Sequence, residues 1–400
     1  MRYNYYINIM YIKRDVEVII SKLLKQYPAV VLVGPRQSGK STIAKNILPK
    51  LPYFSLEDLD VREFAQSDPR SFLERFKNGG IIDEVQKLPE LISYLQSFLD
   101  DKKSNNPIIL TGSAQLTLLS NVSQTLSGRT AIIELLSLTY SESKQSINTP
   151  KSLEQLFYTG LYPRLYKETI NPSDWYHDYV KTYIERDVRD ILKVHNLGTF
   201  QKFLKMCAAR AGQILNLSSL ANDCGISSSA AISWLNILEA TYIVIRVQPH
   251  QQNFSKRLIK APKLYFYDTG LLSFLLGIKS AIELETHSFR GAIMENWVAM
   301  EIIKSQSNNH RPNNLFFWRD NKGVEIDFIV ERGEKLYPIE VKAGKTINSD
   351  YFKNIAYWSN LARDKTNKGF VIYGGDENQI RTNFEVYGWK SIDELTKKLL

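Results

Sequence analysis

Gly-Pro-Arg-Gln-Ser-Gly-Lys-Ser, at residues 34–41, decides the fold of the N-terminal part of this chain. It matches the pattern GxxxxGK[ST], in which glycines let successive backbone amides turn inward around a polyphosphate. A continuous apolar run at 29–33 precedes it, as expected of a buried parallel strand, and residues 42–48 continue as a helix whose amino end faces the anion. The residues that we expect to contact a nucleotide are Gly34, Pro35, Arg36, Gln37, Ser38, Gly39, Lys40, Ser41 and Thr42.

An acidic pair follows a second apolar run. Residues 79–82 read Gly-Gly-Ile-Ile and are followed by Asp83 and Glu84. We expect a strand here to deliver Asp83 to a Mg²⁺ ion that the Ser41 hydroxyl also binds, while Lys40 contacts the β- and γ-phosphates. Glu84 is then the candidate base that orients and deprotonates the attacking water. The two segments together predict a nucleotide hydrolase.

Three further candidates lie downstream. The apolar run 107–110 leads into Thr111 and Ser113, whose hydroxyls would lie where a γ-phosphate sensor is expected. An ordinary turn after a strand is the alternative. Arg129 either neutralises charge that develops on the γ-phosphate, in its own subunit or in a neighbour, or pairs with a surface carboxylate.

Four stretches share order and spacing with a known family. They are 34–41, Ile-Ile-Asp-Glu-Val-Gln-Lys-Leu-Pro-Glu-Leu at 81–91, Leu-Thr-Gly-Ser at 110–113 and Leu-Ser-Gly-Arg at 126–129. They resemble a family of prokaryotic AAA-type ATPases that carry a C-terminal domain of unknown function. The resemblance implies ATP as the nucleotide and Mg²⁺ as its cofactor, and it leaves the biological substrate open. It favours a ring or another homo-oligomer if Arg129 acts on a neighbour.

Charge and composition narrow the choice of partners. Lys and Arg number 51 against 42 Asp and Glu, a net charge of +9, which favours nucleic acid as a partner, most simply DNA bound without sequence specificity. No apolar stretch reaches the length of a membrane span, so we expect no membrane partner and a cytoplasmic location. Cys207 and Cys224 fit buried thiols, and the five histidines lack the spacing of a zinc site.

Residues 200–270 have the pattern of a winged helix-turn-helix. Three predicted helices precede strands at 242–247 and 264–267, which would flank a wing at 248–259. The third helix, within 227–239, contains no Lys or Arg, so base-specific reading of DNA is not expected. A winged helix that contacts only protein is the alternative. Cations at the wing that could contact phosphate are Lys256, Arg257, Lys260 and Lys263.

The C-terminal part carries a second group of charged residues. Two adjacent predicted strands would place Asp327 and Glu340 where both can share a divalent cation, with Lys342 on the same face as Glu340. Glu295 lies on an amphipathic helix upstream. The four residues resemble the D…ExK core of restriction-endonuclease-like folds, which implies metal-dependent phosphodiester cleavage. The alternative is a fold that no longer cuts, in which Asp327, Glu340 and Lys342 form a buried salt bridge.

The chain therefore divides into four predicted units, and its class is α/β. Strands near 29–33, 52–56, 79–84, 107–111 and 130–135 alternate with helical patterns, as in a parallel sheet. The units are an AAA-type P-loop domain at 1–145, a helical connector at 146–199, the winged helix at 200–285 and the restriction-endonuclease-like α/β domain at 286–400.

Two classes of function fit these units. In the first, ATP turnover drives or gates a nuclease-like module that acts on nucleic acid. In the second, the chain is a regulatory switch in which ATP binding changes a protein-interaction surface. Both classes predict ATP hydrolysis.

Overall fold

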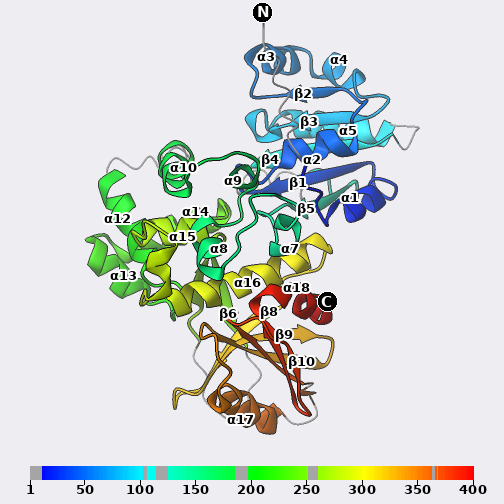
Figure 1. Ribbon diagram of the computed structural model, residues 1–400. Coiled ribbons are helices and arrows are strands. Elements are labelled where there is room, and N and C mark those ends of the chain that lie inside the picture. The colour runs from blue at the N-terminus through cyan, green and yellow to red at the C-terminus, as the bar shows by residue number, and fades with distance from the viewer. Residues whose placement is uncertain are drawn as a thin grey trace, which may run out of the picture.

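The N-terminal part of the computed structural model is a five-stranded parallel sheet (Figure 1). The structure describes residues 11–101, 106–113, 125–184, 197–250, 260–362, 365–366 and 368–400. The strand order is β2-β3-β4-β1-β5. The strands are β1 (Ala29–Gly34), β2 (Tyr53–Ser55), β3 (Gly80–Asp83), β4 (Ile108–Ser113) and β5 (Thr130–Glu134), which confirms the strands predicted in this region.

Both faces of this sheet are covered, which explains the continuous apolar run of β1. Val31 and Val33 pack with one buried cluster, which includes α3 (Leu59–Ser67), α4 (Pro69–Glu74) and α5 (Leu91–Asp101). Val30 and Leu32 point the other way, into a cluster with α1 (Glu17–Leu23) and α2 (Lys40–Ile47). Alternate residues of the strand are thus buried on opposite sides, and each favours the folded state through its apolar area.

A helical region follows. Its first helices are α7 (Tyr140–Ser143), α8 (Leu153–Thr159), α9 (Pro163–Lys167) and α10 (Pro172–Tyr179), with a π-helical segment at Val180–Ile184. The three helices expected after residue 200 correspond to α12 (Leu197–Ala208), α13 (Leu217–Cys224) and α14 (Ser228–Ala240). An antiparallel pair comes next, β6 (Val244–Pro249) with β7 (Lys263–Phe266). Residues 251–259, which include the predicted wing cations Lys256 and Arg257, lie outside the described residues.

The pair β6 and β7 belongs to the C-terminal sheet. That sheet has the order β12-β13-β11-β10-β9-β8-β6-β7, because Gln248 and Pro249 pair in parallel with Phe316 and Phe317. The predicted units on either side of residue 285 therefore share one sheet. Its other strands are β8 (Leu315–Arg319), β9 (Glu325–Arg332), β10 (Lys335–Lys342), β11 (Gly369–Tyr373), β12 (Gln379–Ile380) and β13 (Phe384–Gly388).

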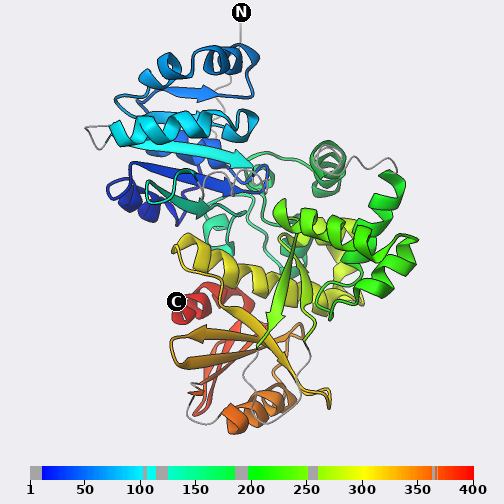
Figure 2. The ribbon, with the colours of Figure 1, turned by 180° about the vertical axis from the view of Figure 1, so that it is seen from behind.

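One long helix lies between the two sheets. Figures 1 and 2 show α16 (Arg290–Asn308) crossing the middle of the molecule, with the N-terminal sheet on one side and the C-terminal sheet on the other. The remaining helices are α15 (Thr269–Leu275), α17 (Lys353–Ala362), α18 (Ile392–Leu399) and short 3₁₀ turns at Val85–Lys87, Ile282–Glu285, Ser349–Phe352 and Trp389–Ser391. The helix α16 thus contacts strands of both sheets, β5 of the first and β7, β8 and β10 of the second.

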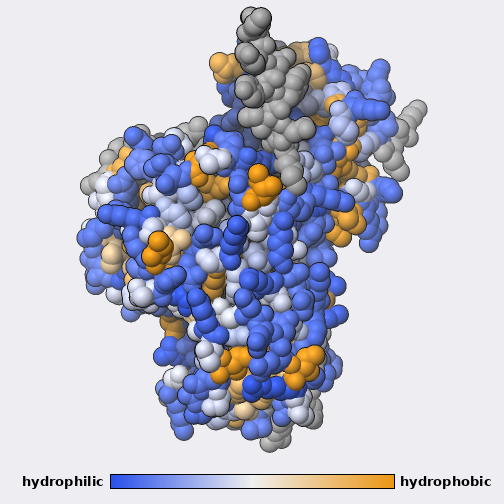
Figure 3. Space-filling model, viewed as in Figure 1, coloured by the Kyte–Doolittle hydropathy of each residue, from blue (hydrophilic) through white to orange (hydrophobic). Residues whose placement is uncertain are grey.

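The face shown in Figure 3 is mainly hydrophilic, and hydrophobic residues on it form small separate groups. Within the described part of the chain, no helix is both long enough and apolar enough to cross a bilayer. Cys207 and Cys224 are both buried and free, as expected.

Candidate functional site

The predicted phosphate-binding loop follows β1, and its two fixed glycines are needed for different reasons. A Cβ on Gly34 would lie 2.2 Å from the carbonyl oxygen of Leu135, so the close passage of that backbone excludes a side chain. Gly39 has open space around it but a φ of 95°, and it directly precedes α2. The loop therefore turns tightly beside the end of β5 and enters α2 through a left-handed residue.

Lys40 and Ser38 are buried in this loop. The Lys40 ammonium donates to the carbonyl oxygens of Gly34 (3.0 Å) and Pro35 (2.8 Å). Burial lowers the pKa of Lys40 to about 8. The Ser38 hydroxyl has no hydrogen-bond partner among the described residues. An oxyanion fits both groups, because it would accept from Ser38 and stabilise the charged form of Lys40.

The structure brings Ser41 and Asp83 together. The Ser41 hydroxyl lies 2.8 Å and 3.0 Å from the two carboxylate oxygens of Asp83. The Tyr53 hydroxyl donates to the same carboxylate at 2.7 Å, and the Thr111 hydroxyl is a third donor. A hydroxyl beside a carboxylate is an oxygen donor set that suits Mg²⁺. The residues present therefore fit the expected ion.

Glu84 continues the acidic pair in an unusual backbone conformation. Its φ is 58°, a left-handed value that a non-glycine residue seldom adopts. Its amide donates to the Thr111 hydroxyl at 3.2 Å, and its carboxylate accepts from the Gln86 amide. Gln86 also donates to the Ser113 hydroxyl at 2.8 Å. Thr111 and Ser113 thus hold the acidic segment in place, and direct contact of either with a γ-phosphate stays a prediction.

A cavity of about 600 Å³ opens in front of the loop. Glu84 lines it together with the loop, and further lining residues come from Tyr11, Ile12 and the segment at α9. The loop residues that line the cavity are Arg36, Gln37, Ser38, Gly39, Lys40, Ser41 and Thr42. Seven of the nine predicted loop contacts, Arg36 to Thr42, therefore line one shared space with Glu84, whereas Gly34, Pro35, Asp83, Thr111 and Ser113 do not line it.

Arg14 is a functional candidate that sequence reasoning missed. It is 4% exposed, and its guanidinium donates to the carbonyl oxygens of Ser38 (3.0 Å), Leu136 (2.9 Å) and Ser137 (3.1 Å). Its Nε lies 3.0 Å from the carboxylate of Glu142. Arg14 thus fixes the phosphate loop to the chain that leaves β5. No local motif marks it, since its partners lie 24 to 128 residues away in sequence.

The proposed role of Arg129 at its own nucleotide is wrong. Arg129 precedes β5, and its carbonyl accepts from the amide of Ala29 at the start of β1. The phosphate loop follows the other end of β1, at Gly34. The exposed Arg129 guanidinium pairs with Asp100, with Nε 2.6 Å from a carboxylate oxygen. This is the surface-pair alternative, and an action on a neighbouring subunit stays a prediction.

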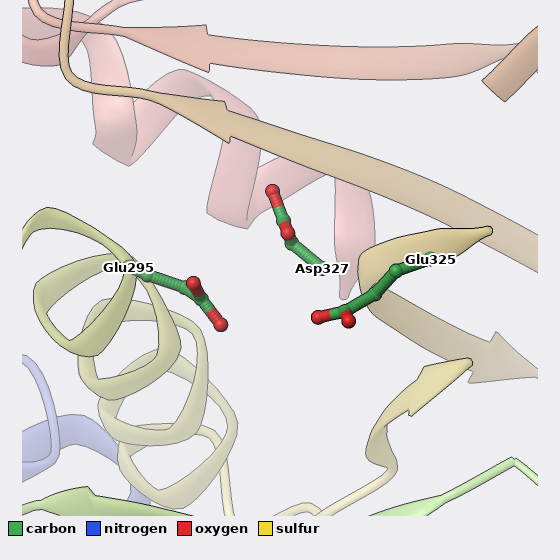
Figure 4. A group of neighbouring side chains, drawn as sticks. All are labelled: Glu295, Glu325 and Asp327. Atoms are coloured by element: carbon green, nitrogen blue, oxygen red, sulfur yellow. The ribbon is translucent and has the colours of Figure 1, made fainter. Parts of the chain in front are cut away.

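A carboxylate cluster lies where the C-terminal group was predicted, with one change of membership. Figure 4 shows Glu295 of α16 pointing toward Glu325 and Asp327 of β9. One oxygen from each of these three carboxylates lies within 4.8 Å of the others. Glu325 was not expected here, although its position two residues before Asp327 on a strand places both side chains on one face.

Lys263 belongs to this cluster, and the prediction that it contacts phosphate from the wing is wrong. The side chain is 3% exposed, and its ammonium lies 2.8 Å from Glu295 and in close contact with Glu325. Burial disfavours the charged ammonium, but the carboxylates of Glu295, Asp327 and Glu325 outweigh it and raise the pKa of Lys263. Lys263 begins β7, and its ammonium points toward the carboxylates on α16 and β9. Lys260 is exposed.

Glu340 and Lys342 lie next to this cluster. Lys342 contacts the Glu340 carboxylate and lies 3.9 Å from that of Asp327. Asp327 also accepts from the amide of Val341 at 2.8 Å. Burial, followed by the charge of Asp327, raises the pKa of Glu340. The oxygen donors of Asp327 and Glu340 fit a hard divalent cation, but Lys342 and Lys263 already supply positive charge around them.

Three family models match the chain in order. An AAA domain matches residues 26–144, a domain of unknown function (DUF8612) matches 150–281, and a second domain of unknown function (DUF4143) matches 290–392.

Similar whole proteins are themselves uncharacterized. Proteins of Mycobacterium tuberculosis and Mycobacterium bovis are each 28% identical over 339 residues, which cover 84% of this chain and 74% of theirs. A protein of Methanocaldococcus jannaschii is 23% identical and covers 90% of this chain and 83% of its own length. Among solved structures, a Walker-type ATPase of Pyrococcus abyssi has a TM-score of 0.44 at 14% identity, over 65% of this chain and 94% of that one.

The matched models fall where the loop, the acidic pair and the carboxylate cluster lie in the structure. The AAA match covers β1 to β5 with the whole phosphate loop, and the last match covers α16 with β8 to β13. The N-terminal AAA domain has the P-loop ATPase fold, which supports nucleotide binding and hydrolysis. The chain is thus a P-loop protein with an N-terminal AAA domain and a C-terminal domain of unknown function.

Proposed function

We propose that this chain binds ATP in the cavity before residues 34–41 and hydrolyses it with Mg²⁺. The observation that supports this best is the 2.8 Å contact between Ser41 and Asp83, directly beside Glu84 in the wall of the cavity. A metal ligand pair and a candidate base thus lie next to the only buried lysine of the phosphate loop. This arrangement suits phosphoryl transfer to water.

Each residue has a defined role in this reaction. Bound Mg²⁺ would neutralise charge on the phosphates, and Ser41 and Asp83 would hold it. Lys40 exchanges the two loop carbonyls that it now contacts for phosphate oxygens. Glu84 orients the attacking water and accepts its proton, while Gln86 positions the Glu84 carboxylate.

Nucleotide binding to three purified proteins tests the site. Lys40→Ala is expected to lose ATP binding, because the loop loses its point charge. Glu84→Gln is expected to bind ATP with the affinity of the unaltered protein, since a base acts on water. Isothermal titration with Mg²⁺-ATP measures both. Unchanged binding by Lys40→Ala would remove the loop from the proposed site.

We further propose that ATP turnover is coupled to nucleic acid handled by the C-terminal domain. The specific observation in favour is the group Asp327, Glu340 and Lys342, whose carboxylates and ammonium lie together at the ends of β9 and β10. Asp327 and Glu340 would hold a divalent ion that activates water toward a phosphodiester. A switch that acts only on proteins is the competing proposal, and it is supported by Lys263, which neutralises the cluster internally.

Salt-dependent DNA binding separates these two outputs. Affinity for a DNA duplex in the presence of ATP should fall steeply as salt rises, because phosphate contacts release counterions. If the protein does not bind DNA in this way, the result supports the protein switch. For cleavage, plasmid is incubated with Mn²⁺ and either unaltered protein or Asp327→Ala. Equal nicking by both proteins would assign the cleavage to a contaminant.

A further inference from the structure

The edge strand β2 brings a tyrosine hydroxyl to Asp83, one of the two residues that are expected to hold Mg²⁺. The Tyr53 hydroxyl donates to a carboxylate oxygen of Asp83 at 2.7 Å. Tyr53 does not line the nucleotide cavity, so we expect no direct contact between Tyr53 and a nucleotide. Any effect of Tyr53 on the proposed reaction must therefore pass through Asp83.

The register of the sheet explains how Tyr53 reaches this position. The strand β2 pairs in parallel with β3, with Tyr53 opposite Ile81 and Ser55 opposite Asp83. Because side chains alternate along a strand, Tyr53, Ile81 and Asp83 lie on the same face of the sheet. Tyr53 and Ile81 pack with the buried cluster that also contains residues of α2. The tyrosine side chain thus lies on the α2 side of the sheet and extends from its own residue pair to the next one.

The helix α2 also contacts the Tyr53 ring directly. The Lys45 ammonium lies 3.5 Å from the centre of the ring, which is a favourable cation–π contact. Ser41 of the same helix donates to both carboxylate oxygens of Asp83. Ser41 and Lys45 are four residues apart, so they lie on one face of the helix. This face of α2 therefore contacts both Asp83 and the tyrosine that bonds to it.

The Asp83 carboxylate accepts from three hydroxyls, which have different expected roles. Ser41 is an expected ligand of the ion, and Thr111 is a candidate γ-phosphate sensor. Thr111 bonds to one carboxylate oxygen and Tyr53 to the other, so together they restrict rotation of the carboxylate. A hydrogen bond from a hydroxyl to an ionised carboxylate is charge-assisted and strong. Tyr53 is thus the donor whose expected role is to orient Asp83 alone.

We propose that Tyr53 is a positioning residue of the magnesium site, whose hydroxyl keeps the Asp83 carboxylate oriented toward Ser41 for binding of a divalent cation with ATP. This inference rests on the proposed ATP site. The affinity for the ion then depends on β2, a strand outside both sequence motifs. Partners that orient a metal ligand in this way typically contribute about 10- to 100-fold to metal affinity.

The test measures how nucleotide binding depends on Mg²⁺. Unaltered protein and Tyr53→Phe are titrated with a non-hydrolysable ATP analogue in EDTA and at a series of free Mg²⁺ concentrations. Tyr53→Phe retains the ring that Lys45 contacts and loses only the hydroxyl. It should need about 10- to 100-fold more free Mg²⁺ for the half-maximal gain in affinity, and it should bind like the unaltered protein in EDTA and at saturating Mg²⁺. Phosphate release from ATP over the same Mg²⁺ series should show the same shift.

A matched control removes the same chemical group at another position. The Tyr242 hydroxyl donates to the carboxylate of Glu134 at 3.0 Å, at the end of β5 in the same sheet. Tyr242→Phe therefore also loses a hydroxyl bond to a carboxylate, but it leaves Asp83 unchanged. It should keep the Mg²⁺ dependence of the unaltered protein. The melting temperatures of the two variants show whether they have lost similar stability.

The outcomes separate this inference from the proposed ATP site. If the unaltered protein binds no nucleotide, the proposed function fails. If it binds nucleotide and loses it on Lys40→Ala, but Tyr53→Phe has the Mg²⁺ dependence of Tyr242→Phe, only the present inference is overturned. Weaker binding by Tyr53→Phe to the same extent in EDTA and at every Mg²⁺ concentration would assign Tyr53 a purely structural role, and would also overturn it.

Discussion

At the scale of single residues, Arg14 is a buried cation whose partners come from distant parts of the chain. It is buried, and it binds three backbone carbonyls and one carboxylate, among them the carbonyl of Ser38 in the phosphate loop. A buried guanidinium is tolerated when its charge is paired; here the two terminal nitrogens donate to carbonyl oxygens, and Nε lies beside the Glu142 carboxylate without a hydrogen bond. The loop conformation therefore depends on a residue that lies outside the motif.

Arg14→Ala is expected to lower stability and ATP affinity together. It leaves the buried Glu142 without its cation, a change that typically costs about 3–5 kcal/mol, and it frees the carbonyl of Ser38. Thermal unfolding measures the first effect and titration with Mg²⁺-ATP the second. Lys13→Ala, at the exposed neighbouring position, is the control. A variant at Arg14 that melts and binds like the control would contradict the role given to it.

The functional residues that could be predicted are those that a short motif or a single strand marks within a few consecutive positions. Lys40 and Ser41 follow from eight consecutive positions, and Asp83 from the end of one apolar run. Arg14 and Lys263 could not be predicted in this way. Each is a long cation whose burial is decided by carboxylates on distant elements, Glu142 for the first and Glu295 for the second.

At the scale of elements, the strands were predictable and their partners were not. The run of β1 is apolar because both faces of its sheet are covered. The residues of β1 alone are therefore enough to predict a buried strand. The pairing of β6 with β8 joins residues nearly 70 positions apart through two residue pairs. No periodicity within either strand specifies that contact, so the sequence suggested two units where one sheet exists.

Two glycine substitutions should have different effects: one should stabilise the fold, and the other should prevent ATP binding. Gly291 lies near the start of α16 with no atom near its absent Cβ and an ordinary φ, so Gly291→Ala should raise the free energy of unfolding by about 0.5 kcal/mol. Gly34→Ala would place a Cβ against the carbonyl of Leu135 and should abolish ATP binding. Thermal melts and nucleotide titration check the pair. A destabilised Gly291→Ala would contradict the open surroundings described for it.

At the scale of the whole molecule, α16 connects the two sheets. Its Glu301 accepts from the amide of Tyr140 at 2.9 Å, Lys304 donates to the carbonyl of Leu138 at 2.8 Å, and Ser307 donates to that of Glu134 at 2.6 Å. The same helix carries Glu295 in the carboxylate cluster. The end of β5 and the chain that follows it are therefore bonded directly to α16.

This junction should respond to pH. Burial raises the pKa of Glu301 from 4.5 to about 7, so between those values the folded protein holds a proton that the unfolded chain has released. The free energy of unfolding then falls as pH rises through this window, by on the order of 3 kcal/mol. Glu301→Gln cannot titrate, and its melting temperature should fall less between pH 5 and 7. Parallel curves for both proteins would show that Glu301 is ionised throughout.

We propose that ATP hydrolysis by this AAA domain depends on Glu84, which lies beside Ser41 and Asp83. The most direct measurement is phosphate release from ATP at saturating nucleotide, by the unaltered protein and Glu84→Gln, with Mg²⁺ and with EDTA. We expect Mg²⁺-dependent turnover that Glu84→Gln slows by about 10²- to 10⁴-fold, the usual contribution of a general base. Equal turnover by the two proteins, or turnover unchanged by EDTA, would contradict it.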